Sequence, residues 1–150
     1  MKLSACYNRY HAALFRTVLV GPVPDAAHTM YAVCQEGLAA AIAALRPGNS
    51  CADAHAAVQG VIDRHGQTAG YRKRSGYSMG ISFAPDWGEG NILSLYRGVD
   101  VPLQPGMVFH VPITLRDYGR FTVAVSETVL VTEGAARTLS GIGRDAVCVA

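Results

Sequence analysis

The 150 residues suffice for about one domain, and the composition (50% hydrophobic, 16% charged) excludes a disordered chain. The formal net charge is only +2, and the one basic cluster, Arg72 to Arg74, is too small to predict nucleic-acid binding. The longest apolar run falls far short of the ~20 residues of a membrane-spanning helix, so no membrane partner is expected.

The N-terminal part of the chain predicts strands and then a helix. Residues 15–21, FRTVLVG, predict a strand, and the preceding residues form a candidate second strand with a turn near Asn8-Arg9. Residues 22–48 predict a helix that Pro47-Gly48 ends, with Pro24 in its first turn. Its apolar residues recur at spacings of three and four, which places one stripe on one face: Met30, Cys34, Leu38, Ala41 and Leu45.

A second helix is predicted over residues 50–66. Ser50 and Asp53 have the spacing of a capping box, and Gly66 is a suitable C-terminal stop. The buried stripe is expected to consist of Ala54, Val58, Val61 and Ile62. The histidines of the two helices are expected on helix surfaces: His28, His55 and His65.

The C-terminal half predicts strands punctuated by glycine turns. The predicted strands are residues 78–84, 107–115 and 121–132, with a loop at 85–91 and turns at 103–106 and 117–120. Helices come early and strands late, which indicates an α+β fold with an antiparallel sheet backed by helices. Pro112 inside a strand predicts an edge or a bulge.

Glu127 and His110 lie on opposite faces of the predicted hairpin. The face that carries Glu127 is otherwise apolar and should pack on the helices, so this carboxylate needs partners. A structural carboxylate that ties a helix or loop to the sheet is the preferred interpretation, ahead of catalysis. His110 is expected near Ser126 or Thr128, on a surface suited to a site floor, although a lone histidine on a strand is more often structural.

Trp87 lies between Asp86 and Glu89 in the predicted loop. It suits a lid over a cationic or zwitterionic ligand, through a cation–π contact. A tryptophan tucked over the sheet edge explains the same pattern, and both interpretations stand.

The four cysteines are widely spaced: Cys6, Cys34, Cys51 and Cys148. They form no CxxC pair and no zinc-binding spacing, and no signal pattern precedes them. Reduced thiols in a cytoplasmic protein are therefore expected.

Four segments in a fixed order resemble the pita-bread superfamily of methionine aminopeptidase, aminopeptidase P, prolidase and creatinase. These segments are RTVLVG, SGYSMGIS, LQPGMVFHVPI and VSETVLVTE, and they extend over nearly the whole chain. The resemblance implies a truncated pita-bread domain, an α+β fold with a curved antiparallel sheet backed by helices. It also implies that residues 1–150 are a single partial domain, a C-terminal fragment without the N-terminal creatinase-like domain.

Metallopeptidases of that superfamily hold two metal ions with two aspartates, one histidine and two glutamates. The resemblance places these positions at Lys2, Ala13, Tyr77, Pro112 and Ser126. None of these side chains is a usual ligand of such a site, which needs several anionic oxygens. The resemblance therefore implies chemistry without a metal cofactor.

Within the superfamily, the chain looks most like the ectoine-hydrolase branch, where creatinase-like hydrolysis proceeds without metal. This implies opening of the cyclic amidine ectoine, a small-molecule substrate, to an N-acetylated diaminobutyrate. The expected catalytic residue is His110 as general base or acid, assisted by Tyr77 and Glu127. Trp87, His11 and Ser126 are expected to bind the substrate.

Two other functions stay open. One is an inactive truncated module that binds a ligand or a partner subunit, and the other is an Xaa-Pro metallopeptidase. A missing half-domain would expose apolar surface, so a homodimer is expected.

Overall fold

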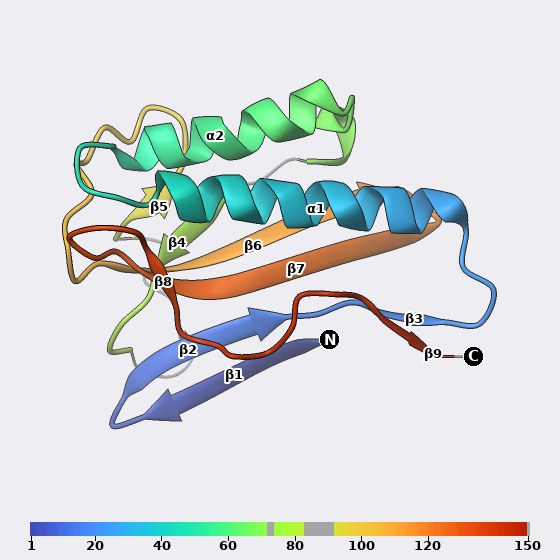
Figure 1. The fold of residues 1–150 in the computed structure, drawn as a ribbon, viewed down its shortest axis with the longest axis horizontal. Helices are drawn as coiled ribbons and strands as arrows, with labels where there is room; N and C mark the ends of the chain where they lie inside the picture. Colours follow the sequence, from blue (N-terminus) through green and yellow to red (C-terminus); the bar gives the residue numbers. More distant parts are fainter. Residues whose placement is uncertain (72–73, 83–91, 150) are drawn as a thin grey trace.

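The computed structural model describes residues 1–71, 74–82 and 92–149. Figure 1 shows three layers in this part of the chain. Helices α1 (Asp25–Ala44) and α2 (Cys51–Arg64) cover one face of a five-stranded sheet. The hairpin of β1 (Lys2–Tyr7) and β2 (Tyr10–Phe15) lies on the opposite side of that sheet. The predicted α+β fold with an antiparallel sheet backed by helices is confirmed.

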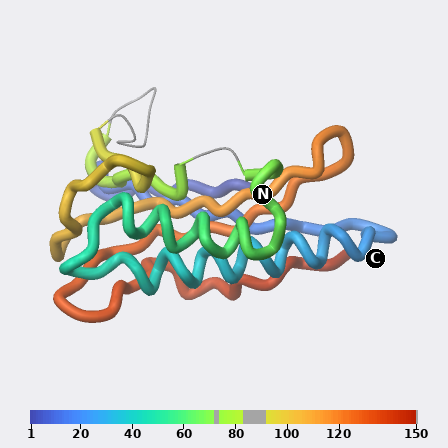
Figure 2. The backbone as a smooth tube through the Cα atoms, turned by 90° about the horizontal axis from the view of Figure 1, so that it is seen from above, coloured from blue at the N-terminus to red at the C-terminus, as the bar shows by residue number. Residues whose placement is uncertain are grey.

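The main sheet has the strand order β5-β4-β6-β7-β8, and every neighbouring pair is antiparallel. Its strands are β5 (Ser94–Leu95), β4 (Gly76–Ser78), β6 (Val108–Asp117), β7 (Phe121–Leu130) and β8 (Arg137–Thr138). Outside it, β3 (Val18–Val20) pairs in parallel with β9 (Val147–Val149), and a short 3-10 helix spans Thr68–Gly70. Viewed from above, the two helices run side by side over the sheet (Figure 2).

Both predicted helices and their buried stripes are confirmed. All nine residues predicted for the two stripes are buried. The capping box is present, because Asp53 N donates to Ser50 Oγ at 3.1 Å and Ser50 N donates to Asp53 Oδ2 at 2.8 Å. Pro24 is the N-cap residue of α1 and therefore lies just before its first turn.

The predicted N-terminal strand is interrupted at Arg16 and Thr17, between β2 and β3. The interruption follows from Arg16, whose side chain turns into the interior and is only 5% exposed. The turn before β2 is confirmed, since Asn8 and Arg9 both have positive φ, 46° and 68°. Two such residues suit the primed turn of a two-residue hairpin.

The strand predicted over residues 78–84 is wrong in the described residues. Strand β4 ends at Ser78, where the prediction began, and Ile81 makes only an isolated bridge to Tyr10. The strand forms earlier because Gly76 passes so close to β6 that an added Cβ would lie 2.8 Å from the His110 carbonyl oxygen. The predicted loop with Trp87 lies outside the described residues.

The strand β7 presents its apolar face to the helices, as predicted. Val123, Val125 and Val129 of β7, and Val131 directly after it, are at most 1% exposed and belong to the same core as the helix stripes. At Pro112, β6 pairs with β7 but lies beyond its described pairs with β4, so the proline occupies a local edge. No helix in the described ranges is long and apolar enough to cross a membrane.

Candidate functional site

His110 lies at the centre of a cluster built by three neighbouring strands. The register places it directly opposite Tyr77 on β4 and Thr128 on β7. Its Nδ1 atom is 2.7 Å from Tyr77 Oη and its Nε2 atom is 2.7 Å from Ser126 Oγ. The imidazole is completely buried, whereas the Tyr77 side chain is half-buried. The expected proximity of His110 to Ser126 and Thr128 is confirmed.

Aromatic and cationic neighbours complete the surroundings of His110. The Phe15 and Tyr77 rings meet its ring edge-on, with centroid distances of 5.1 and 5.2 Å. Burial, together with the positive charge of Lys2, lowers the pKa of His110 to about 3. The imidazole is therefore neutral at neutral pH.

The hydrogen bonds around Ser126 assign the tautomer of His110. The Phe15 N–H donates to Ser126 Oγ at 2.7 Å, so the Ser126 oxygen acts as an acceptor there. The Ser126 hydroxyl proton needs an acceptor of its own, and among the described contacts only His110 Nε2 provides one. We therefore assign Nε2 as unprotonated and Nδ1–H as the donor to Tyr77 Oη.

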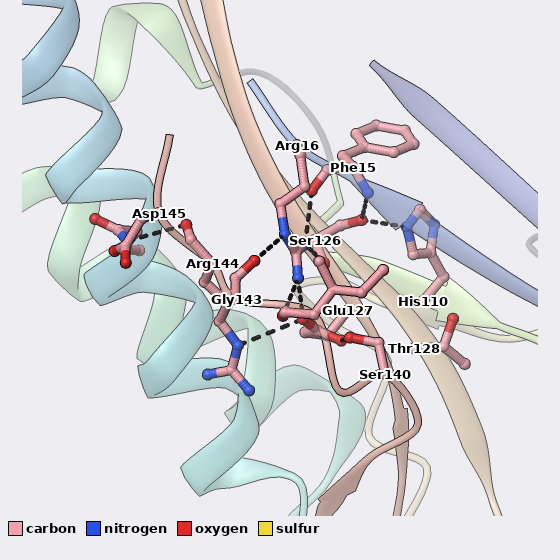
Figure 3. Close-up of polar contacts among 12 residues, drawn as sticks. Phe15, Arg16, His110, Ser126, Glu127, Thr128, Ser140, Gly143, Arg144 and Asp145 are labelled. Atoms are coloured by element: carbon pink, nitrogen blue, oxygen red, sulfur yellow. Dashed lines mark hydrogen bonds and ion pairs between the residues drawn. The ribbon is translucent and has the colours of Figure 1, made fainter. Parts of the chain in front are cut away.

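The β1–β2 hairpin is held to the sheet by hydroxyl groups of β7. Thr128 Oγ1 accepts from Ala13 N and donates to Ala13 O, both at 2.9 Å. Together with the Phe15–Ser126 bond, these contacts tie the β2 backbone to the strand that carries Ser126. Figure 3 shows Phe15, Ser126 and His110 on the same side of β7.

The Glu127 carboxylate lies away from His110, because alternate residues of a strand face opposite sides. It is completely buried and accepts from Arg16 Nη2 at 2.6 Å, Ser140 Oγ at 2.7 Å and Arg144 Nε at 3.4 Å. Figure 3 shows this group of side chains separate from the imidazole. Glu127 thus ties residues 140–144 to the sheet and is not brought into the His110 cluster.

Arg16 connects the two sides of β7. Besides Glu127, its guanidinium donates to Ser126 O at 2.7 Å, Gly143 O at 2.6 Å and Ile142 O at 2.9 Å. The sequence around Arg16 does not predict this role, since an arginine before a threonine carries no pattern that indicates burial.

The structure leaves the predicted substrate-binding residue His11 apart from the cluster. His11 Nδ1 lies 3.3 Å from Ser82 Oγ, and no hydrogen bond to His110 is described for it. Trp87 lies outside the described residues.

His55 is not on a helix surface, contrary to the prediction. It is 6% exposed, and its Nδ1 lies 2.7 Å from Ser75 Oγ, which is also 2.7 Å from Tyr71 Oη. Burial lowers the pKa of His55. The burial of His55 could have been predicted from its spacing in the sequence, because it shares one helical face with Cys51, Val58 and Ile62.

Comparison with known proteins identifies the family. The family model of metallopeptidase family M24 matches residues 1–133. This chain belongs to metallopeptidase family M24. The crystal structure of the prolidase from Thermococcus sibiricus superposes with a TM-score of 0.87 at 22% sequence identity, covering 98% of this chain and 38% of that one. The expected pita-bread fold is thereby confirmed.

Two curated relatives are more similar in sequence. The ectoine hydrolase of Halomonas elongata is 34% identical over 145 residues, which cover 95% of this chain and 35% of the relative. The agropine synthesis cyclase of Rhizobium rhizogenes is 35% identical over 128 residues, or 83% of this chain and 31% of the relative. The chain thus spans about a third of the length of these relatives.

The five positions at which the resemblance implies metal ligands lie in and beside the His110 cluster but carry unsuitable side chains. Tyr77 and Ser126 form hydrogen bonds with His110, and Pro112 is paired with Ser126 across β6 and β7. The backbone of Ala13 forms a hydrogen bond with Thr128, and the Lys2 ammonium lies beside the Phe15 ring. These five residues supply no carboxylate, and one is a cation. In the described ranges, no three His, Cys, Asp or Glu side chains come together as a metal site would require. This donor set does not fit a di-metal centre.

Proposed function

We propose that this chain is a metal-independent hydrolase of C–N bonds in a small zwitterionic or cyclic amidine substrate such as ectoine. The observation that carries the proposal is the Tyr77–His110–Ser126 chain of hydrogen bonds, at positions where the resemblance implies metal ligands. A neutral histidine that donates its Nδ1–H to a phenol supports proton transfer by that phenol. The 34% sequence identity with the ectoine hydrolase of Halomonas elongata supports the same reaction class.

The names of the two curated relatives agree with chemistry on a ring. One is called a hydrolase of ectoine and the other a cyclase. Hydrolytic opening of a ring and ring closure with loss of water are one reaction in opposite directions. An active site of this ancestry therefore suits a compact cyclic substrate.

Tyr77 is the group in this chain of hydrogen bonds that can touch a substrate, because it is only half-buried whereas His110 and Ser126 are fully buried. In the proposed reaction, the oxygen of water bonds to the amidine carbon, the carbon–nitrogen double bond becomes a single bond, and one water proton goes to the nitrogen of that bond. The carbon–oxygen double bond then forms as the bond to the leaving nitrogen breaks. Tyr77 Oη gives a proton to the leaving nitrogen and regains one from the hydroxyl group that came from water. The Nδ1–H of His110 stabilises negative charge on the Tyr77 oxygen while its proton is transferred.

The other expected site residues have subsidiary roles in this proposal. Trp87 and His11 contact the substrate. Glu127 acts from the opposite side of β7, by orienting Arg16, which donates to the Ser126 carbonyl oxygen.

Incubation of the purified chain with ectoine, followed by proton NMR, tests the function. Appearance of an N-acetylated diaminobutyrate supports the proposal, and a Y77F variant should lose it. Cleavage of an Xaa-Pro dipeptide with no ectoine turnover would instead favour a peptidase. Ectoine binding without turnover of either compound would favour an inactive binding module.

We further propose a homodimer formed through β1. Reciprocal backbone bonds between Met1 and Arg16 make these residues a hydrogen-bonded pair. By alternation along an antiparallel pair, the backbone groups of Lys2, Ser4 and Cys6 point to the open edge of β1, which in the described residues pairs only with β2. Antiparallel pairing centred on Ser4 places Lys2 opposite the partner's Cys6 and satisfies this edge without opposing like charges.

Disulfide trapping tests this interface. In a background with Cys6 and Cys148 changed to serine, S4C should form a disulfide with the partner's copy on mild oxidation, because paired Cα atoms about 5.5 Å apart suit that bond. A monomer by light scattering, with no cross-linking of S4C, would contradict the dimer.

We also propose a cytoplasmic location. All four cysteines are free, and Cys6 and Cys148 are exposed. Exposed free thiols are typical of a reducing compartment.

A further inference from the structure

Lys2 opens strand β1 on the side of the hairpin that faces His110. It pairs with Phe15 in the β1–β2 register, and its Nζ atom lies 5.6 Å from the centroid of the Phe15 ring. The same Phe15 ring contacts the imidazole of His110 at 5.1 Å. At this separation the positive charge of Lys2 adds to burial in lowering the pKa of His110.

A cavity of about 310 Å³ lies beside Lys2. Its lining includes Phe15 from β2 and Thr122 and Ala124 from β7. Since alternate residues of a strand share a face, Thr122 and Ala124 lie on the same face of β7 as Ser126. The cavity therefore adjoins the surface that carries the His110 cluster and is large enough for a small carboxylic acid or a substrate end.

Lys2 reverses the charge expected at its position. The resemblance to the metallopeptidases places an aspartate there, within a set of four carboxylates that balances two metal ions. In this chain those four positions carry one lysine, Lys2, and three uncharged side chains, at Ala13, Pro112 and Ser126, and the histidine position carries Tyr77. An aspartate at this position would repel an anionic ligand if no metal were bound, whereas the ammonium of Lys2 attracts one.

Arg16 also lines the cavity, but its guanidinium already donates hydrogen bonds to other groups of the protein. It donates to Glu127 and to four backbone carbonyl oxygens, those of Phe15, Ser126, Ile142 and Gly143. An arginine held in this way has little capacity for a further anion. Lys2 is exposed, and an ammonium on a flexible stem can move to meet a ligand.

We propose that Lys2 binds a carboxylate group of the substrate, so that the site selects small carboxylated molecules. The inference rests on the proposed function and names the substrate class. The ammonium anchors the carboxylate in the cavity, and the remainder of the molecule extends along β7 towards Tyr77. Lys2 thereby supplies the positive charge for an anionic substrate that metal ions would supply in a metallopeptidase.

Binding of two matched probes tests the carboxylate subsite without relying on turnover. Calorimetry would compare ectoine with its carboxamide, which lacks the negative charge, on the wild-type chain and on K2M, K2R and R137M. The wild type should bind ectoine about tenfold or more tightly than the amide, and K2M should lose that preference while its amide affinity stays unchanged. K2R should retain most of the preference, and R137M, which changes an exposed arginine on β8, should behave as the wild type.

A second measurement locates Lys2 independently of any ligand. NMR titration of the His110 imidazole in K2M should give a higher pKa than in the wild type, because a neighbouring positive charge has been removed. Lys2-dependent carboxylate binding without ectoine hydrolysis would retain the subsite and refute the proposed reaction. Ectoine hydrolysis with unchanged affinity in K2M, or equal binding or no binding of the two probes by the wild type, would overturn the subsite.

Discussion

Tyr77 and His110 are separated by 33 positions in the chain, yet the register of β4 and β6 sets their side chains 2.7 Å apart, Oη to Nδ1. The His110 imidazole is buried and the Tyr77 phenol is half-buried, so the phenol lies between the histidine and the solvent-accessible surface. Because the buried His110 acts on the substrate only through the phenol that its Nδ1–H contacts, Tyr77 is the residue on which turnover depends most directly.

The Y77F variant should therefore lose ectoine turnover by about 10²–10⁴-fold, the usual contribution of a positioned acid or base. Its affinity for ectoine should change much less, since the aromatic ring remains. Rates and calorimetric affinities measure the two effects separately. Y7F is the matched control because Tyr7 is 81% exposed on β1, and an equal loss in both variants would contradict the role of Tyr77.

His110 makes stability depend on pH. The pKa of its side chain falls from 6.5 to about 3 on folding, so the unfolded chain binds a proton more readily than the folded chain. The folded state is therefore at its full stability above pH 6.5 and loses up to about 1.4 kcal/mol per pH unit between pH 6.5 and 3.

Urea unfolding at pH 7, 5 and 4 measures this dependence in the wild type and in H110Q. The glutamine variant should be less stable at pH 7 and should show a shallower loss towards pH 4. Some loss should remain, because His55 also has a lowered pKa. Equal slopes for the two proteins would refute the assignment to His110.

Ser126 fixes the tautomer of His110 by donating its hydroxyl proton to Nε2. Nitrogen-15 NMR of the wild type at neutral pH should show an unprotonated Nε2 and a protonated Nδ1. S126A should give a mixture of tautomers, with S140A as a control for loss of a serine hydroxyl elsewhere, on the Glu127 side. A protonated Nε2 in the wild type would show that the assigned direction of the hydrogen bonds is wrong.

Glu127 and Arg16 form a buried ion pair that should matter chiefly for stability. Removing one member leaves a buried charge without its partner, so E127Q and R16M should each lose about 3–5 kcal/mol of unfolding free energy. The double variant R16M/E127L should lose less than the sum of the two. Chemical denaturation gives these values, and E36Q, which alters an exposed ion pair with Arg64, should change stability little.

The predictable features of this fold follow from local patterns. Helical periodicity identified the buried residues of α1 and α2, and the tight turn at residues 117–120 set the register that brings His110 near Ser126. The site features that were missed depend on distant contacts. The partners of Glu127 include Arg16 and Arg144, and the position of β4 depends on the close approach of Gly76 to the His110 backbone. No short stretch of sequence contains either relationship.

The most direct test of the central claim is the rate of ectoine hydrolysis after exhaustive chelation of divalent metals, measured with and without added Mn²⁺, Co²⁺ or Zn²⁺. The proposed proton transfer by Tyr77, assisted by His110, predicts the same rate in all these conditions. Activity that disappears on chelation and returns with a metal would contradict a metal-independent hydrolase.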